Sequence, residues 1–183
     1  NNVKKEVFSW IKSIVIALVI VVGVRHFLFA PTTVHGESMS PTFEDSNRVI
    51  LNKISDVDRF GMIVFHAPDA DENYIKRVIG LPGDTVEMKN DVLYINGKAY
   101  KEPYLKESKK PLAPNEKFTE DFTLQTLPAT DGKVKVPKNS LFVMGDNRPV
   151  SHDGRAFGFI PQKSVIGKVQ FRYYPLNEVG EPK

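Results

Sequence analysis

The serine most suited to chemistry in this chain is Ser38, in the stretch Gly36-Glu37-Ser38-Met39-Ser40-Pro41-Thr42-Phe43. A turn of small residues closed by a proline can hold a hydroxyl in an exposed and fixed position. A serine hydroxyl becomes an effective nucleophile only when a neighbouring group removes its proton. Serine-rich turns are common, so this stretch alone is a weak signal. A catalytic interpretation therefore requires a base elsewhere in the chain.

Histidine is the usual base for a serine, but none of the histidines here suits that role well. His35 belongs to the same short segment as Ser38, and His152 stands directly before Asp153. Neighbouring residues on an extended chain point to opposite faces, which disfavours a triad of Ser38, His152 and Asp153. The remaining two histidines are His26, in an apolar N-terminal segment, and His66, at the end of a predicted strand.

Lys76 is a better candidate for the base. It lies in the alternating segment Tyr74-Ile75-Lys76-Arg77-Val78-Ile79, so Lys76 and Arg77 point to opposite faces of a predicted strand. A solvated lysine would have no special role, and that is the usual case on a strand. A buried lysine loses the solvation that favours its ammonium form, so its pKa falls and the neutral amine becomes a base. The pattern alone leaves both interpretations open.

The N-terminal segment predicts a membrane anchor in residues 1–30. The run Ile14 to Val24 is apolar throughout, and extension to residues 8–29 gives the length of about 20 residues that a spanning helix needs. Lys12 and Arg25 then stand where basic side chains reach the headgroups. A buried core helix is disfavoured because the run is apolar on all faces.

A cleaved signal peptide is the alternative interpretation of the same segment, because lysines precede a short apolar run. Cleavage after Ala30 would place the large Leu28 at the −3 position and Pro31 directly after the cut, which favours an uncleaved anchor. Lysines precede the span and acidic residues follow it. The positive-inside rule then predicts a cytoplasmic N-terminus and an extracytoplasmic body, residues 31–183.

The body has the pattern of a mainly β fold. Short β-branched or aromatic runs are bounded by turn residues, and Asn96-Gly97 is a strong hairpin signal. We expect an antiparallel β-sheet domain, either two packed sheets or a distorted barrel, with a loop-rich insertion or lobe at about residues 101–136. The predicted strands are 48–52, 62–66, 74–79, 92–95, 98–100, 140–144 and 169–174.

Composition excludes several classes of function. The chain has no cysteine, which removes disulfide frameworks, cysteine-based zinc sites and thiol nucleophiles such as that of sortases. The net charge of +3 lies within residues 1–30, and the remaining chain has equal numbers of acidic and basic residues. A body without a basic excess argues against nucleic acid as a partner.

Three motifs together resemble the type I signal peptidases of bacteria. They are the Ser38 stretch, the run Lys76-Arg77-Val78-Ile79-Gly80-Leu81-Pro82-Gly83-Asp84, and Gly145-Asp146-Asn147-Arg148 followed by Ser151, Asp153 and Arg155. Their order, their spacing and the preceding anchor all match that family, from the span to about Tyr174. The short chain and single span resemble its Gram-positive branch.

The resemblance implies a role for each matching residue. Ser38 would be the nucleophile and Lys76 the general base, while Ser151 would orient the lysine amine by a hydrogen bond. The Ser38 backbone N–H would donate to the oxyanion; some relatives have a serine at the position of Gly36 as a second donor. The remaining matches are substrate-binding positions Val34, Gly36, Met39, Phe43, Tyr74 and Ile75, and structural ion pairs of Arg77 with Asp146 and of Asp153 with Arg155.

The function so implied is a membrane-bound serine endopeptidase that cleaves signal peptides after small residues of the Ala-x-Ala type. Its partners would be preprotein signal peptides and the lipid bilayer, with proximity to the secretion translocase, and it would need no cofactor or metal. The third motif departs from the family at Pro149, Val150 and Gly154, and Gly154 could loosen its loop.

Three rival functions stay open at this point. The first is a LexA-type self-cleaving Ser-Lys peptidase, although this chain has an anchor in place of a DNA-binding region. The second is a weakly catalytic or non-catalytic membrane-tethered binding module on the same fold. The third is a structural partner in a secretion complex.

Overall fold

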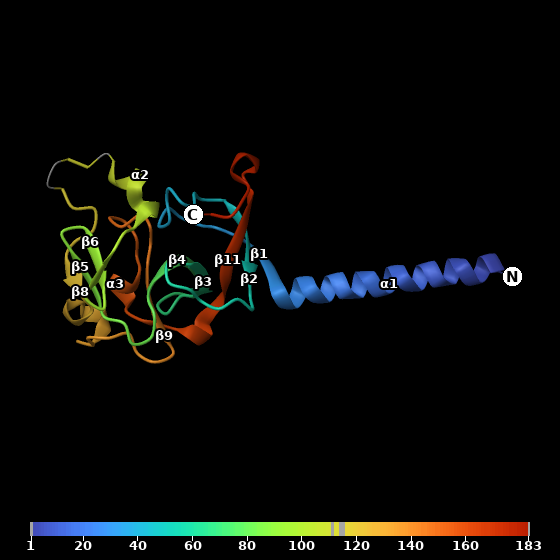
Figure 1. Cartoon of the computed structure of the whole chain (residues 1–183), viewed down its shortest axis with the longest axis horizontal. Helices are drawn as coiled ribbons and strands as arrows, with labels where there is room; N and C mark the ends of the chain where they lie inside the picture. The colour runs from blue at the N-terminus through green and yellow to red at the C-terminus, as the bar shows by residue number, and fades with distance from the viewer. Residues whose placement is uncertain (1, 111, 114–115, 183) are drawn as a thin grey trace.

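A computed structural model of the chain describes residues 2–110, 112–113 and 116–182. The chain forms a long N-terminal helix that projects from a β-rich body (Figure 1). Within the predicted lobe 101–136, residues 111, 114 and 115 lie outside the described residues, as do the first and last residues of the chain. The predicted mainly β fold with an N-terminal apolar helix is confirmed.

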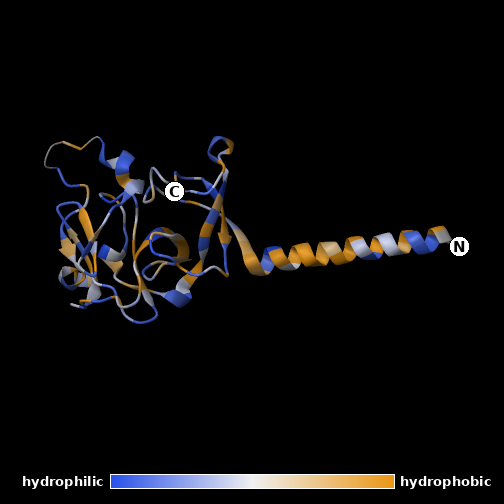
Figure 2. Cartoon of the chain, viewed as in Figure 1, coloured by the Kyte–Doolittle hydropathy of each residue, from blue (hydrophilic) through white to orange (hydrophobic). Residues whose placement is uncertain are grey.

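Helix α1 (Asn2–Leu28) has the properties of a membrane span. Residues Val3–Leu28 are long and apolar enough to cross a membrane, and none of the span is buried against the body. Hydrophobic residues occupy the middle of the helix, whereas polar residues gather towards its N-terminal end (Figure 2). A helix that exposes apolar residues on every side needs an apolar surrounding, which the bilayer supplies.

The larger sheet is antiparallel throughout and curls into a half-barrel. Its strand order is β1-β2-β11-β3-β4-β9-β10. Strand β1 directly continues α1, so the structure places Phe29 and Ala30 in the sheet, and its Pro31 is tolerated because β1 is an edge strand. The strands are β1 (Phe29–Thr33), β2 (Arg48–Asn52), β3 (Met62–His66), β4 (Asn73–Gly80), β9 (Ser140–Met144), β10 (Ile160–Pro161) and β11 (Val165–Tyr174).

The smaller sheet has the order β7-β6-β5-β8 and lies on the side of the body away from α1 (Figure 1). Asn96 and Gly97 both have positive φ, 52° and 76°, and join β6 to β7 as the expected hairpin. The strands are β5 (Val86–Lys89), β6 (Val92–Ile95), β7 (Lys98–Tyr100) and β8 (Phe122–Thr123).

Short helices fill the connections of the body. Most of them lie in the predicted lobe or between β9 and β11. They are η1 (Pro103–Leu105), α2 (Lys106–Lys109), η2 (Leu124–Thr126), η3 (Pro128–Thr130), α3 (Gly154–Phe157), η4 (Gln162–Ser164) and η5 (Leu176–Glu178).

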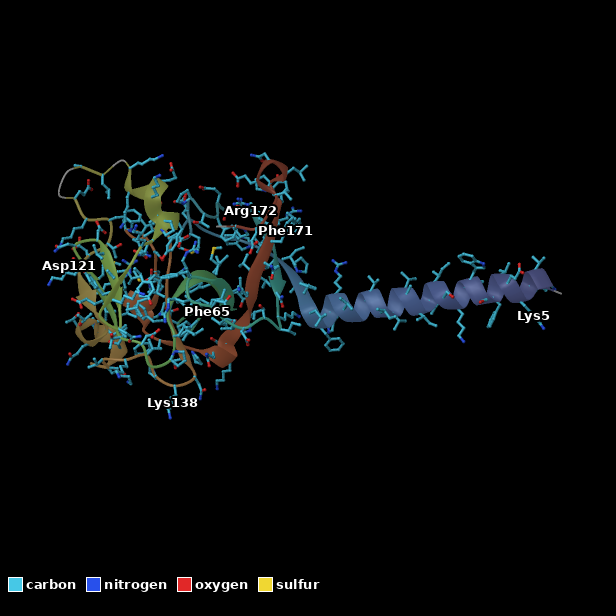
Figure 3. All side chains as sticks on the ribbon, viewed as in Figure 1. Lys5, Phe65, Asp121, Lys138, Phe171 and Arg172 are labelled. Carbon is cyan, nitrogen blue, oxygen red and sulfur yellow. The ribbon has the colours of Figure 1, made fainter. Side chains whose placement is uncertain are left out.

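One hydrophobic cluster joins the two sheets, and two more lie within the large sheet. Ile79 and Phe142 from the large sheet pack with Met88, Leu93 and other small-sheet residues. A second cluster packs the segment between β1 and β2 onto the sheet, and a third includes Phe65, which lies inside the body in Figure 3. The sheets therefore share a core, and burial of this apolar surface fixes their arrangement.

Candidate active site

Ser38 lies in the turn segment between β1 and β2, above a buried apolar base. Val34, Met39 and Phe43 are almost completely buried in the cluster beneath it. Backbone hydrogen bonds tie the segment together, including Val34 N–H to Asn47 O at 2.8 Å and Phe43 N–H to Met39 O at 2.9 Å. The turn is thus anchored through its apolar side chains while Ser38 stays partly accessible.

Lys76 points from strand β4 at the Ser38 hydroxyl. Its Nζ lies 2.7 Å from Ser38 Oγ and donates to Ile75 O at 3.1 Å. Only 4% of Lys76 is exposed, and this burial lowers its pKa to about 8, although Asp153 and Asp146 favour the charged form. A lysine with this pKa is partly neutral near physiological pH and can accept the serine proton.

Arg77, the neighbour of Lys76, is buried as well, so the strand hides both basic residues. The guanidinium of Arg77 forms two hydrogen bonds to Asp146, at 2.8 and 2.6 Å, and lies 3.9 Å from the centre of the Tyr104 ring. Thr42 Oγ1 donates to the same carboxylate at 2.5 Å. The loop after β9 is thereby tied to the segment that carries Ser38.

Asp153 stabilises the C-terminal part of the loop that follows β9. It accepts from Gly145 N–H at 2.9 Å and from both Nε and Nη2 of Arg155, at 2.9 and 2.8 Å. Burial raises the pKa of Asp153, but these hydrogen bonds and the Arg155 charge outweigh it and hold the pKa below its ordinary value. His152, in contrast, pairs with Asp69 at 2.5 Å, so it does not form a triad with Asp153.

Ser151 is close to the dyad, but its expected hydrogen bond to Lys76 is absent from this structure. Its Oγ is buried and has no hydrogen-bond partner among the described residues. Gly145 leaves it room, because a Cβ on Gly145 would come 2.1 Å from Ser151 Oγ and 2.4 Å from Ser38 O. A hydroxyl can both donate and accept a hydrogen bond, and among the described residues the hydroxyl of Ser151 does neither.

A cleft of about 420 Å³ opens beside the dyad. The Ser38 segment forms one wall and the start of β4 forms the other. Of the predicted substrate-binding residues, Gly36, Tyr74 and Ile75 line this cleft, whereas Val34, Met39 and Phe43 lie in the core below it. The lining residues are His35, Gly36, Glu37, Ser38, Glu72, Asn73, Tyr74, Ile75, Lys76, Val150 and His152.

A larger apolar groove of about 730 Å³ lies elsewhere, between α1 and the outer face of the sheet. It includes Val24, Phe29 and Phe171, and Figure 3 shows Phe171 close to the base of the helix. Neither Ser38 nor Lys76 lines it, so this groove lies beside the apolar helix and apart from the dyad.

Several residues that support the site were not singled out from the sequence. Asn147 donates its backbone N–H to Ser38 O at 3.0 Å and its Nδ2 to Glu37 O at 3.1 Å. Arg148 is buried against Glu102, at the beginning of the lobe. Asn147 and Arg148 belong to the third motif but were given no role there, whereas Glu102 lies outside all three motifs.

Several known proteins are similar to this chain over most of its length. The family model described as "Signal peptidase, peptidase S26" matches residues 7–174. The chain is 45% identical over 180 residues to signal peptidase IB of Staphylococcus aureus, covering 96% of this chain and 93% of that protein. It is 46% identical over 167 residues to signal peptidase I of Bacillus caldolyticus, with 89% of each covered.

A solved structure shares the fold. The crystal structure of a signal peptidase I from Enterococcus faecalis V583 matches with a TM-score of 0.61 and 49% identity, over 63% of this chain and 97% of that one. Together with a family model that matches most of the chain, this shows that the protein belongs to the signal peptidase family, peptidase S26.

Proposed function

We propose that this membrane-bound serine endopeptidase cuts signal peptides from preproteins with Ser38 as nucleophile and Lys76 as general base. The observation that carries the proposal is the 2.7 Å separation of Ser38 Oγ and the buried Lys76 Nζ. Among the described residues, Lys76 has no buried acidic partner in hydrogen-bond contact. Its hydrogen-bonded neighbours are a hydroxyl and a carbonyl, which suits a neutral amine.

The reaction proceeds in two halves. Ser38 Oγ attacks the scissile carbonyl carbon while Lys76 Nζ takes the hydroxyl proton, and the C–N bond then breaks as Nζ passes that proton to the leaving amine. Water attacks the resulting ester, Lys76 takes a proton from it, and the proton returns to Ser38. Ser151, whose buried hydroxyl lies beside the dyad, would bind and orient the Lys76 amine during these steps.

The oxyanion of each tetrahedral intermediate needs a hydrogen-bond donor. The backbone N–H of Ser38 donates to no acceptor among the described residues, so it is free for this task. Gly36 has no side-chain hydroxyl, and its own N–H is already given to Asp45 Oδ1 at 2.8 Å. The Ser38 N–H therefore carries the main part of oxyanion binding.

The substrate would bind as an added strand in the cleft. Residues Asn73 to Lys76 pair with β3 on one side, whereas β9 pairs only from Arg77 onwards, which leaves one edge of the strand for a substrate. Main-chain hydrogen bonds to this edge would give affinity. In an extended peptide the −1 and −3 side chains point the same way, so both would face the same cleft wall, which favours small residues at both positions.

Mutation of the dyad tests this proposal. The full chain in detergent is mixed with a preprotein, and the cut is mapped by sequencing the N-terminus of the product. We expect Ser38→Ala and Lys76→Ala to lose cleavage, while the controls Ser40→Ala and Lys98→Ala, in the same turn and on an exposed strand, keep it. Full activity of both dyad variants would contradict the mechanism.

The charges around α1 support a cytoplasmic N-terminus with the body outside. Lys4, Lys5 and Lys12 stand before or at the start of the span, whereas acidic residues follow it. The absence of cysteine allows a clean test with single cysteines introduced by Val3→Cys and Lys98→Cys. A membrane-impermeant maleimide on intact cells should label only the second variant; labelling of only the first would reverse the topology. In this orientation the site meets preproteins at the outer membrane face, in proximity to the translocase.

A further inference from the structure

We infer that Glu102, at the start of the lobe, is a positioning residue. It holds the nucleophile and the base in place relative to each other through Arg148 and Tyr104. The inference rests on the Ser38–Lys76 dyad proposed above. It gives the lobe a role in the reaction, because Glu102 belongs to the segment between β7 and η1 and does not touch the cleft.

The first observation is a buried ion pair. Arg148 Nη2 donates to Glu102 Oε1, and the side chains are 0% and 4% exposed, respectively. Arg148 Nη1 also lies 3.4 Å from both Glu102 Oε2 and Thr119 Oγ1. A guanidinium buried this deeply would be strongly disfavoured without its carboxylate, so the position of Arg148 depends on Glu102.

Arg148 in turn shapes the loop that follows β9. Its Nε donates to Gly145 O at 2.9 Å, its backbone N–H donates to Asp146 O at 3.0 Å, and its backbone carbonyl accepts from Arg155 Nη2 at 2.8 Å. Hydrogen bonds of the Arg148 side chain and backbone therefore hold this loop together where it meets the active site.

The loop reaches the nucleophile directly. Asn147, between Asp146 and Arg148, holds Ser38 O and Glu37 O through its backbone N–H and its Nδ2. Gly145 packs so closely that a Cβ there would lie 2.4 Å from Ser38 O. A shift of this loop would therefore move Ser38.

A second path leads from Glu102 to the base. Tyr104 Oη donates to Glu102 Oε1 at 2.7 Å, and the Tyr104 ring supports the Arg77 guanidinium at 3.9 Å. Arg77 follows Lys76 on strand β4 and pairs with Asp146. One carboxylate thus supports both the loop that touches Ser38 and the residue next to Lys76.

A residue that positions the dyad should affect catalysis more than substrate binding. A misplacement of about 1 Å can cost about 10²-fold in rate. A looser loop would also admit water to Lys76, and a better-solvated lysine has a higher pKa. The acidic limb of the pH–rate profile should then move to higher pH, which a loss of stability alone would not produce.

The experiment removes the pair without leaving a buried charge. Glu102→Gln combined with Arg148→Gln is compared with Glu107→Gln combined with Lys110→Gln, an exposed pair in the same lobe with the same change of charge. Cleavage of a preprotein by the full chain in detergent is measured per folded molecule. We expect kcat of the first variant to fall by about 10²-fold, with KM within about twofold and the acidic limb at higher pH, and the control to match wild type.

Wild-type kcat and an unchanged acidic limb in the folded Glu102/Arg148 variant would overturn the inference, as would a loss that follows only the folded fraction. Should that variant not fold, Glu102→Asp keeps the charge but withdraws the carboxylate. It should show a smaller loss of kcat with the same direction of pH shift, and wild-type behaviour would overturn the inference equally. Ser38→Ala in the same assay separates the two proposals: activity in that variant would contradict the dyad, whereas its inactivity beside a wild-type-like Glu102/Arg148 variant would contradict only the role of Glu102.

Discussion

The Nζ atom of Lys76 lies 2.7 Å from the Oγ atom of Ser38, although 38 residues separate them in the sequence. The two are brought together by different elements, a turn anchored in the core and a central strand of the large sheet. Burial of the lysine is what makes this contact chemically useful, because it favours the neutral amine.

The pKa of Lys76 predicts the pH dependence of cleavage. The neutral amine is the active form, and burial lowers its pKa to about 8, so kcat/KM should rise about tenfold per pH unit below that value and level off above it. The measurement is cleavage of a preprotein in detergent between pH 6 and pH 10, in buffers of constant ionic strength. A rate that stays flat through this range would show that no group with such a pKa controls the reaction.

The same burial makes Lys76 costly for stability. Its pKa is about 8 when folded and 10.5 ordinarily, so below pH 8 the folded protein carries the full penalty of a buried ammonium. As the pH rises from 8 to 10.5 the unfolded chain binds more protons than the folded one, and the penalty is relieved. We expect Lys76→Met to be inactive yet more stable, by about 2–3 kcal/mol at pH 7, with the difference shrinking above pH 8.

Denaturant unfolding of the full chain measures the difference in stability between Lys76→Met and wild type at pH 7 and at pH 10. Lys98→Met, at an exposed position, is the matched control and should change stability by less than about 0.5 kcal/mol at either pH. A Lys76→Met variant that is less stable than wild type at pH 7 would mean that its hydrogen bonds outweigh the burial of its charge.

Gly145 has no room for a side chain. A Cβ there would lie 2.1 Å from Ser151 Oγ and 2.4 Å from the backbone oxygen of Ser38. Because backbone cannot swing aside as a side chain can, Gly145→Ala should displace Ser38 and lower kcat by about 10²-fold or more. Gly23→Ala, in a helix with nothing within 4 Å, is the control and should keep activity; equal activity of the two variants would contradict the contact.

The carboxylate of Asp146 joins three segments, so graded substitutions should give graded effects. Asp146→Ala leaves the buried Arg77 unpaired and should destabilise the protein by about 3–5 kcal/mol. Thr42→Val removes only the 2.5 Å hydrogen bond to Asp146, with an expected cost of about 1.5–3 kcal/mol. Lys117→Ala breaks an exposed pair with Asp121 and should have the smallest effect on stability of the three. Unfolding in urea checks the order, and similar values for all three would contradict it.

Much of the fold follows from local pattern. The alternating runs at 48–52, 62–66 and 140–144 coincide with β2, β3 and β9, because each combines β-branched residues with clear turn residues at its ends. Strand β1 was not predicted since Pro31 lies within it, and β8 and β10 have only two residues each, too few for a periodic signal. These strands exist because neighbouring strands pair with them, which a local pattern cannot show.

The sequence motifs indicated part of the candidate site, whereas its residues outside the motifs were not predicted. The resemblance of three motifs to a known family pointed to Ser38 and Lys76, whereas Glu102 lies in a polar segment whose composition suggests a solvated loop. It is buried only because Arg148, 46 residues later, folds against it. The pattern of apolar residues in the sequence also does not distinguish the wall of a cleft from the core beneath it. Met39 and Phe43, which were predicted to bind substrate, lie in the core.

Gly36 marks the point at which a second oxyanion donor could be added. A Cβ there meets nothing within 4 Å, but the φ of +79° should cost any other residue about 1–2 kcal/mol. Gly36→Ala and Gly36→Ser should therefore lose similar stability.

If residue 36 faces the oxyanion, the hydroxyl of Gly36→Ser can donate to it, and one such donor is worth up to about 10²–10³-fold in kcat. We expect Gly36→Ser to exceed Gly36→Ala in kcat by about tenfold, a part of that range because the new hydroxyl is not preorganised. The measurement is kcat of both variants on one preprotein, and equal values would show that the oxyanion lies away from residue 36.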